Sequence, residues 1–187
     1  MRQLDASHKE SIKGNLAHWC YEVDSEFQQV NDAAVEEAYD LIYKLDLRVV
    51  ELGCGDGASL RKFQELGVTT VGVDINADKL DRAVGETIKA DMVDYLWGVK
   101  NNSIPNIFMH HSLEHIIKVE ELLNLVSAKL AKGGIFYCVV PADDTPNTVH
   151  YTAFDSAKEL LPPGLEPIEV VKQERFGHPE FKCVAIK

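Results

Sequence analysis

Residues 48–60 combine two carboxylates with three closely spaced glycines, residue types that together can bind a small charged ligand against the main chain. A β-branched run ends at Glu51, glycines then occupy alternate positions from Gly53 to Gly57, and Asp56 lies between the last two. The pattern predicts a buried strand that turns tightly into a helix. Glycine tolerates positive φ and lets a ligand approach the backbone, while the start of the helix presents free N–H groups. We therefore expect a nucleotide-containing cofactor here.

The charges in this turn indicate which cofactor binds. The segment Gly53–Ala58 fits the relaxed G-x-G-x-x-A dinucleotide fingerprint, with Asp74 following at about the expected 20-residue separation. A dinucleotide would bring a doubly charged pyrophosphate to the turn, where Glu51 and Asp56 would repel it. S-adenosylmethionine carries a cationic ammonium and a cationic sulfonium and no phosphate. We therefore favour S-adenosylmethionine over NAD.

Five segments, in order along the chain, resemble the motifs of the class I S-adenosylmethionine-dependent methyltransferases. They are Val49–Gly57, Val71–Ile75, Lys89–Met92, Ile107–Ile116 and Lys129–Phe136. The resemblance implies a Rossmann-like α/β fold: a doubly wound, mostly parallel seven-stranded sheet with helices on both faces and a C-terminal antiparallel hairpin. It also implies a methyltransferase activity with S-adenosylhomocysteine as the product.

The resemblance assigns the cofactor site to three parts of the chain. The glycine turn contacts the methionine end of the cofactor, the acid after the second strand accepts the ribose hydroxyls, and a third acid accepts from the adenine amino group. The residues so assigned are Glu51, Gly53, Cys54, Gly55, Asp74, Ile75, Asp91, Met92 and, through its backbone, His110.

Plainer roles compete for several of these residues. Asp74 can instead cap a helix, a role for which Asn76 competes. Asp94 follows Asp91 closely, so either aspartate can make the contact with the adenine amino group. Cys54 lies at a predicted helix N-terminus, which lowers a thiol pKa, but we favour a small packing residue over a nucleophile.

The segment His110–His115 offers metal ligands or a general base. His111, Glu114 and His115 match the H-x-x-E-H pattern of inverted zinc peptidases, which we discount because the first histidine follows a strand rather than lying on a helix. The segment also resembles the E-x-x-E-H of a methyltransferase subset that binds a divalent metal, with His111 in place of the first glutamate. Imidazole would shift the metal preference from magnesium toward zinc, manganese or iron. His150 is a fourth candidate ligand.

Our first interpretation is that no metal binds to these residues. Glu114 and His115 would then fix the loop by hydrogen bonds, and His111 would face the acceptor. Methyl transfer needs mainly alignment of the reactants, and an oxygen nucleophile also benefits from a base near neutral pKa. His111 is the first candidate for this catalytic role and His150 the second. The alternatives are a non-catalytic, S-adenosylmethionine-binding regulatory domain and, less favoured, an NAD-binding oxidoreductase.

The amino-acid composition limits which classes of binding partner we expect. The 187 residues carry 19 basic and 30 acidic side chains, a formal net charge of −11, which disfavours nucleic-acid binding. No apolar stretch is long enough for a transmembrane helix and no signal peptide is recognisable, so we expect a cytoplasmic protein without membrane insertion. The four cysteines lack paired spacing, which favours reduced thiols. We expect a small-molecule methyl acceptor and leave a homodimer open.

The elements that must position these residues follow from apolar runs and glycine punctuation. Strands are predicted at 49–54, 69–75, 87–91, 104–110 and 135–140, and helices at 32–45, 58–66, 76–82, 119–131 and 154–161, before an antiparallel pair at 168–175 and 181–187. We expect a single domain over residues 1–187. Residues 1–30 would form a lid or packing segment, 31–141 the cofactor-binding core, and 142–187 the substrate-side loop and C-terminal hairpin.

Overall fold

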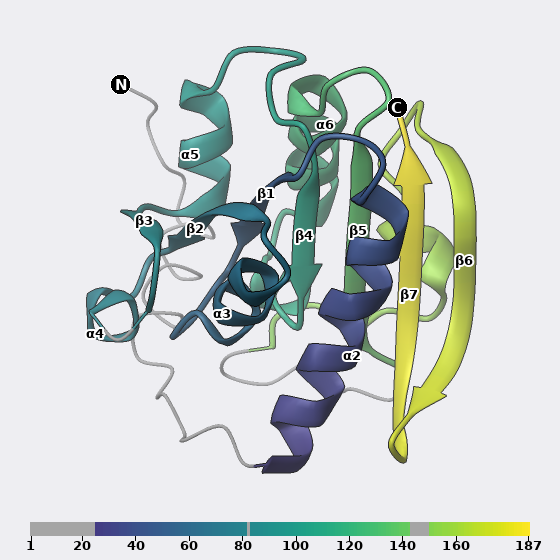
Figure 1. The fold of residues 1–187 in the computed structure, drawn as a ribbon. Helices are drawn as coiled ribbons and strands as arrows, with labels where there is room; N and C mark the ends of the chain where they lie inside the picture. Colours follow the sequence, from purple (N-terminus) through teal and green to yellow (C-terminus); the bar gives the residue numbers. More distant parts are fainter. Residues whose placement is uncertain (1–24, 82, 143–149) are drawn as a thin grey trace.

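The computed structural model describes residues 25–81, 83–142 and 150–187, which form a seven-stranded sheet flanked by helices (Figure 1). The strands are β1 (Arg48–Leu52), β2 (Thr69–Asp74), β3 (Glu86–Lys89), β4 (Ile107–His110), β5 (Ile135–Pro141), β6 (Glu166–Arg175) and β7 (His178–Ile186). The α-helices are α2 (Ser25–Ile42), α3 (Ala58–Glu65), α4 (Ala77–Leu80), α5 (Met92–Gly98) and α6 (Val119–Lys129). Two 3₁₀ turns are η1 (Leu113–His115) and η2 (Ala157–Leu160).

The sheet has the order β3-β2-β1-β4-β5-β7-β6. Strands β1 to β5 run parallel, and β7 is inserted antiparallel between β5 and the edge strand β6. The predicted doubly wound sheet with a C-terminal antiparallel hairpin is confirmed. Because the winding reverses between β1 and β4, a crevice for ligands is expected outside the carboxyl ends of these two strands.

Alternating side chains of the strands pack against helices on both faces of the sheet. On one face, Val35 of α2 and Phe63 of α3 lie in a buried cluster with Phe108 of β4 and Tyr137 of β5. The rings of Phe108 and Tyr137 stack with centroids 5.2 Å apart. This face is therefore covered by α2 and α3, as Figure 1 shows.

The opposite face carries the larger apolar cluster. Leu96 of α5 and Leu122 of α6 pack there with Met109 of β4 and Cys138 of β5, each the immediate neighbour of a residue on the first face. Since successive strand residues point to opposite faces, this alternation explains why the central strands are apolar on both sides. None of the described helices is both long and apolar enough to cross a membrane.

Several predicted element boundaries are wrong. The first helix was expected at 32–45, but α2 begins at Ser25 and ends at Ile42, where a tight turn closed by the Leu45 N–H on the Ile42 carbonyl leads toward β1. Because α2 runs through residue 30, the expected boundary between residues 30 and 31 falls inside a helix. Of the N-terminal segment, residues 1–24 lie outside the described part.

Two further helices also differ from expectation. Helix α5 was not predicted, because seven residues give too short an apolar pattern; its N-cap, Asp91, was assigned to the cofactor instead. The helix predicted at 154–161 is only the 3₁₀ turn η2, started by a capping box of Ser156 and Glu159 and followed by two prolines. The helix after Asn76 has four residues, ending at Leu80, and residue 82 is outside the described part.

Candidate functional site

The glycine turn is held against two neighbouring strands. The N–H groups of Gly53 and Cys54 donate to the Val73 carbonyl of β2 at 2.7 and 3.1 Å. Gly53 has φ +82°, and a Cβ there would lie 2.5 Å from the Cβ of Ser112, so this contact excludes any larger residue. Among the described residues, no atom lies within 4 Å of a Cβ placed on Gly55, so these residues leave the turn open on that side. The backbone of the turn is therefore accessible at Gly55, the position where we expect the cofactor to approach.

Glu51, the residue before the last in β1, is a buried carboxylate beside this turn. Burial, and after it the hydrogen bond from Ser59 and the repulsion of Asp74 and Asp56, leave its pKa raised to about 8. Its Oε2 atom has no hydrogen-bond partner among the described residues. A buried acceptor without a donor is costly, and a cationic ligand group would both satisfy it and favour its charged form. This oxygen fits the ammonium group expected of S-adenosylmethionine.

Asp74 connects the glycine turn to the end of β2. Its Oδ2 accepts from the Gly55 N–H at 2.9 Å and its Oδ1 from the Asn76 N–H at 2.8 Å. The cap of α4 is Asn76, whose Oδ1 accepts from the Lys79 N–H at 3.3 Å, so the competing role for Asp74 is taken by its neighbour. A carboxylate has about four lone-pair positions, and the remaining ones are available to ligand hydroxyls.

Asp91 and Met92 follow β3 at the same edge of the sheet. The Asp91 carboxylate caps α5, with Oδ1 accepting from the N–H groups of Val93 at 2.9 Å and Asp94 at 3.1 Å. Asp91 is buried whereas Asp94 is exposed, which favours Asp91 for the predicted adenine contact. The Met92 methyl group lies 3.4 Å from a Cβ built on Gly53, so two separate motifs meet at the turn.

The expected pKa effect on Cys54 is wrong. Burial, with the negative charges of Glu51 and Asp74, raises the pKa of this thiol, and these effects outweigh its position before α3. Its Sγ atom lies 2.7 Å from a Cβ built on Gly72, which shows the close packing of the side chain against β2. Cys54 is a packing residue, and its assignment to the cofactor rests on its backbone. Cys54, Cys138 and Cys183 are free and buried.

His111 lies directly after β4, between two buried carboxylates. Its Nδ1 is 3.7 Å from Oε1 of Glu114, and its Nε2 is 3.5 Å from Oε1 of Glu180. The residue has φ +49°, a conformation that side chains other than glycine seldom adopt, and its N–H donates to the Val139 carbonyl at 3.0 Å. Strain of this kind is typical of functional positions.

His110, which was assigned to the cofactor through its backbone, is buried inside the sheet. Its ring stacks on Phe108 with centroids 6.2 Å apart. Burial, and to a lesser degree the charges of His111 and Arg175, hold the pKa of His110 well below its ordinary value. This imidazole is therefore neutral.

The four candidate metal ligands divide between two adjacent groups. Glu114, His115 and His150 lie together, and their ligand-type atoms are all within 4.8 Å of one another. The rings of His115 and His150 are 4.8 Å apart at an angle of 74°. His111 belongs instead to a group with His110 and Glu180, although its Nδ1 still faces Glu114. Two imidazoles with one carboxylate suit zinc, manganese or iron better than magnesium.

Sequence reasoning missed Glu180, which lies on β7 and is wholly buried. Burial alone would raise its pKa, but the nearby donors of His111 and Gln173 and the positive charges of His111 and Arg175 outweigh it, so the pKa is lowered. No sequence motif marks this glutamate. The only signal is an acid in a strand whose next residues are mostly apolar.

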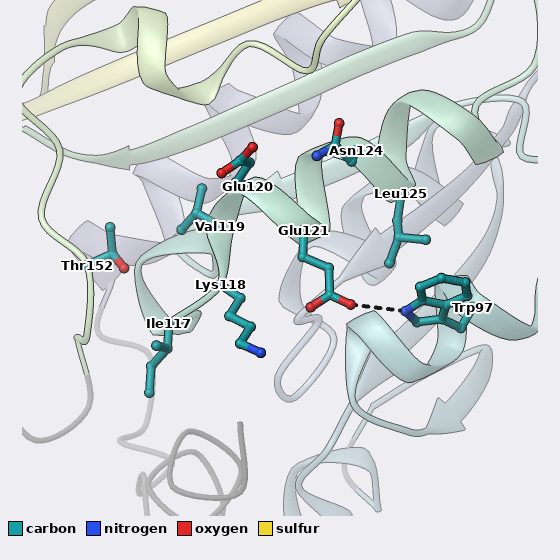
Figure 2. Close-up of a pocket in the computed structure, with 9 residues that line it drawn as sticks. All are labelled: Trp97, Ile117, Lys118, Val119, Glu120, Glu121, Asn124, Leu125 and Thr152. Carbon is teal, nitrogen blue, oxygen red and sulfur yellow. Dashed lines mark hydrogen bonds between the residues drawn. The ribbon is translucent and has the colours of Figure 1, made fainter. Parts of the chain in front are cut away.

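A separate groove of about 700 Å³ lies between α5 and α6 (Figure 2). The Trp97 indole borders it and donates to Glu121 of α6 at 3.2 Å. Ile117 and Thr152, which follow the two histidine segments, line its other end. No residue assigned to the cofactor lines this groove. Residues 143–149, part of the predicted substrate-side loop, lie outside the described residues.

Comparisons with known proteins agree with this geometry. Residues 20–171 match the family model described as a methyltransferase domain. The chain is similar to a SAM-dependent methyltransferase from Archaeoglobus fulgidus, with a TM-score of 0.70 and 19% identity over 86% of this chain and 94% of that one. It is also similar to the PH0226 protein from Pyrococcus horikoshii OT3, with a TM-score of 0.70 and 14% identity over 88% and 93% of the two chains.

A third similar structure is the [4+2]-cyclase SpnF, with a TM-score of 0.69 and 14% identity over 96% of this chain and 91% of that one. At these identities the structural likeness establishes the fold. No curated protein matches the sequence significantly.

Proposed function

The chain belongs to the methyltransferase-domain family and is an S-adenosylmethionine-dependent methyltransferase, and from this premise we propose that it methylates an oxygen atom of a small molecule. The observation that carries the proposal is the imidazole of His111, which lies between two buried carboxylates just beyond the end of β4. An imidazole so placed suits an acceptor that must lose a proton, and a hydroxyl group is such an acceptor.

We propose that the cofactor lies across the carboxyl ends of β1, β2 and β3. Glu51 would accept from its ammonium group, Asp74 from its ribose hydroxyls and Asp91 from its adenine amino group. S-adenosylmethionine supplies an electrophilic methyl group. Two observations support this placement. The buried Oε2 of Glu51 lacks a hydrogen-bond partner among the described residues, and Gly55 leaves the adjoining space open.

In the proposed step, His111 takes up the proton that the acceptor hydroxyl loses as its oxygen is methylated. Glu114 and Glu180 would stabilise the imidazolium that results. His150 remains the second candidate for this role, because it lies beside His115 and Glu114.

Two measurements test the proposal. Calorimetry with S-adenosylmethionine, S-adenosylhomocysteine and NAD should show binding of the first two only. Methyl transfer from S-adenosylmethionine to a panel of small hydroxylated metabolites should then fall by about 100-fold in His111→Gln, the usual size of a general-base contribution. His178→Gln is the matched control, because this exposed histidine lies at the start of β7. Cofactor binding without transfer to any acceptor would instead favour a regulatory domain.

The cluster of Glu114, His115 and His150 supports a second candidate role, the binding of a divalent cation that holds the acceptor. Metal analysis of protein purified without an affinity tag, together with methyl transfer after chelation, tests this role. Bound zinc, manganese or iron at one ion per chain, lost in His150→Gln, is the supporting result. Metal-free protein with full activity would exclude this metal-binding role.

A further inference from the structure

We infer that Asn31 of α2 donates a hydrogen bond to the carboxylate at the amino-acid end of S-adenosylmethionine, while Glu51 accepts from the ammonium group of the same end. The inference rests on the proposed contact between Glu51 and that ammonium group, and it adds the residue that recognises the neighbouring negative charge. Asn31 lies outside all five cofactor motifs. It reaches the glycine turn because α2 and α3 pack together on one face of the sheet.

Asn31 is a buried residue whose amide is only half used within the protein. Its side chain belongs to a residue that is 3% exposed. The Oδ1 atom accepts from the Ser59 hydroxyl at 2.7 Å, whereas the Nδ2 atom has no hydrogen-bond partner among the described residues. A buried donor without an acceptor is costly, so this position suits a ligand that brings an acceptor.

Ser59 links this amide to Glu51. Its hydroxyl donates to Asn31 and also lies close enough to Glu51 to influence the pKa of that carboxyl through a hydrogen bond. Two buried atoms without partners, Nδ2 of Asn31 and Oε2 of Glu51, thus belong to side chains that share Ser59 as a neighbour. One atom is a donor and the other is an acceptor. An α-amino acid carries the complementary groups, a carboxylate and an ammonium, on a single carbon atom.

The backbone of the glycine turn has few donors left for this carboxylate. The N–H groups of Gly53, Cys54, Gly55 and Gly57 all donate to acceptors within the protein. The start of α3 still offers donors, because the N–H groups of its first turn have no partner within a helix. Since Ser59 is the second residue of α3, Asn31 lies beside the positive end of this helix, which also favours a carboxylate.

The charges around the turn explain why a neutral donor suits this position. Asp74 and Asp56 lie close enough to Glu51 for their charges to raise its pKa. Three acids attract the ammonium and sulfonium groups of the cofactor, but they repel its carboxylate. An amide compensates for that repulsion by a hydrogen bond, and it adds no positive charge that would oppose the binding of the two cationic groups. Asn31 would therefore distinguish S-adenosylmethionine from adenosine derivatives that lack the carboxylate.

A thermodynamic cycle with two ligands tests the inference. The ligands are S-adenosylmethionine and its decarboxylated analogue, which keeps the ammonium and sulfonium groups and lacks the carboxylate. Measured by calorimetry, Asn31→Ala should weaken S-adenosylmethionine binding by about 10- to 100-fold, the effect of losing a hydrogen bond to a charged group. The same variant should leave the Kd of the analogue unchanged. Glu51→Gln should weaken both ligands, since both carry the ammonium group.

Gln29→Ala is the matched control, because it removes an exposed amide from the same helix and should leave both Kd values unchanged. Equal losses for the two ligands in Asn31→Ala would overturn the inference, since Asn31 would then not act on the carboxylate. Wild-type affinity for S-adenosylmethionine in Asn31→Ala would also overturn it and would leave the proposed function standing. Wild-type protein that binds no S-adenosylmethionine would remove the proposed cofactor site itself.

A second measurement needs no variant and so covers the case in which Asn31→Ala does not fold. In a crystal structure of the wild-type protein with S-adenosylhomocysteine, which has the same amino-acid end, Nδ2 of Asn31 should lie about 2.7–3.2 Å from a carboxylate oxygen of the ligand. A ligand carboxylate that is bound by other donors, away from Asn31, would refute the inference.

Discussion

Replacing Glu51 with glutamine should weaken cofactor binding and at the same time stabilise the ligand-free protein. Without ligand, burial raises the pKa of Glu51 to about 8, so the folded protein holds this proton at neutral pH. An ammonium group placed against the carboxylate favours the charged form, and binding must then release the proton. The same feature that makes Glu51 costly in the empty site makes it a partner for a cation.

The magnitude follows from the shifted pKa. With a pKa of about 8, roughly 0.9 of the Glu51 side chains are protonated at pH 7, so binding should release roughly 0.9 proton. The Kd of S-adenosylmethionine should fall nearly 10-fold between about pH 6 and pH 7, below the range in which the ligand's own amino group loses its proton. In Glu51→Gln the loss of a charged hydrogen bond, about 1.5–3 kcal/mol, should weaken binding by about 10- to 100-fold.

Stability should change in the opposite direction. Because the folded pKa of Glu51 exceeds the ordinary value of 4.5, its stabilising contribution is complete below that value and is lost as pH rises through about 8. The full loss is at most about 5 kcal/mol at 1.36 kcal/mol per unit. Glu51→Gln lacks this titration, so its unfolding free energy should exceed that of the wild type increasingly toward pH 9.

Calorimetry in buffers of different ionisation enthalpy measures the released protons, and urea unfolding from pH 5 to 9 measures the stability. Glu65→Gln, which removes an exposed carboxylate from α3, is the control and should match the wild type in both assays. Binding at pH 7 without release of a proton would refute the assignment of this carboxylate to the cationic group. So would wild-type affinity in Glu51→Gln.

Three further changes should have measurable effects. Asp74→Ala removes the acceptor for the Gly55 N–H and for ligand hydroxyls. It should weaken S-adenosylmethionine binding, measured by calorimetry, at least 10-fold, which is about 1.4 kcal/mol or more. Unchanged affinity would contradict the ribose contact. Gly53→Ala places a Cβ 2.5 Å from Ser112 and should lower Tm by several degrees, as destabilisation of about 1–3 kcal/mol implies; a wild-type Tm would show that the turn can shift. Lys182→Met removes a buried cation from two part-exposed carboxylates and should cost about 1.5–3 kcal/mol in urea unfolding. Lys158→Met at an exposed site should cost nothing measurable.

The cofactor turn was predictable because its signals are local. Glu51 and the glycines lie within seven residues of one another, and the charge of the ligand can be judged from that short segment alone. Asp74 was also predictable as a residue that ends a strand at the carboxyl edge, and the structure places it against Gly55. The helix that Asp91 caps was missed because its seven residues give too short an apolar pattern, and its N-cap is a residue type that also suits a ligand contact.

The histidine region was only partly predictable. The sequence singled out His111, Glu114, His115 and His150, but it treated them as one possible site. The structure places His111, which has a left-handed backbone, in a different group, with its Nε2 3.5 Å from Glu180 of β7. No pattern of residue types encodes that turn, which a histidine adopts only when the surrounding contacts impose it.

By itself, then, the sequence determined the fold class and the charge of the cofactor, since apolar periodicity and the residues of a single turn are sufficient for both. Only the tertiary structure decided what surrounds the candidate base. Glu180 and Arg175 lie at the end of the chain, and they reach His111 because β7 enters the sheet antiparallel beside β5. The partners of a buried charge are set by strand order and register, which join residues that no local spacing connects.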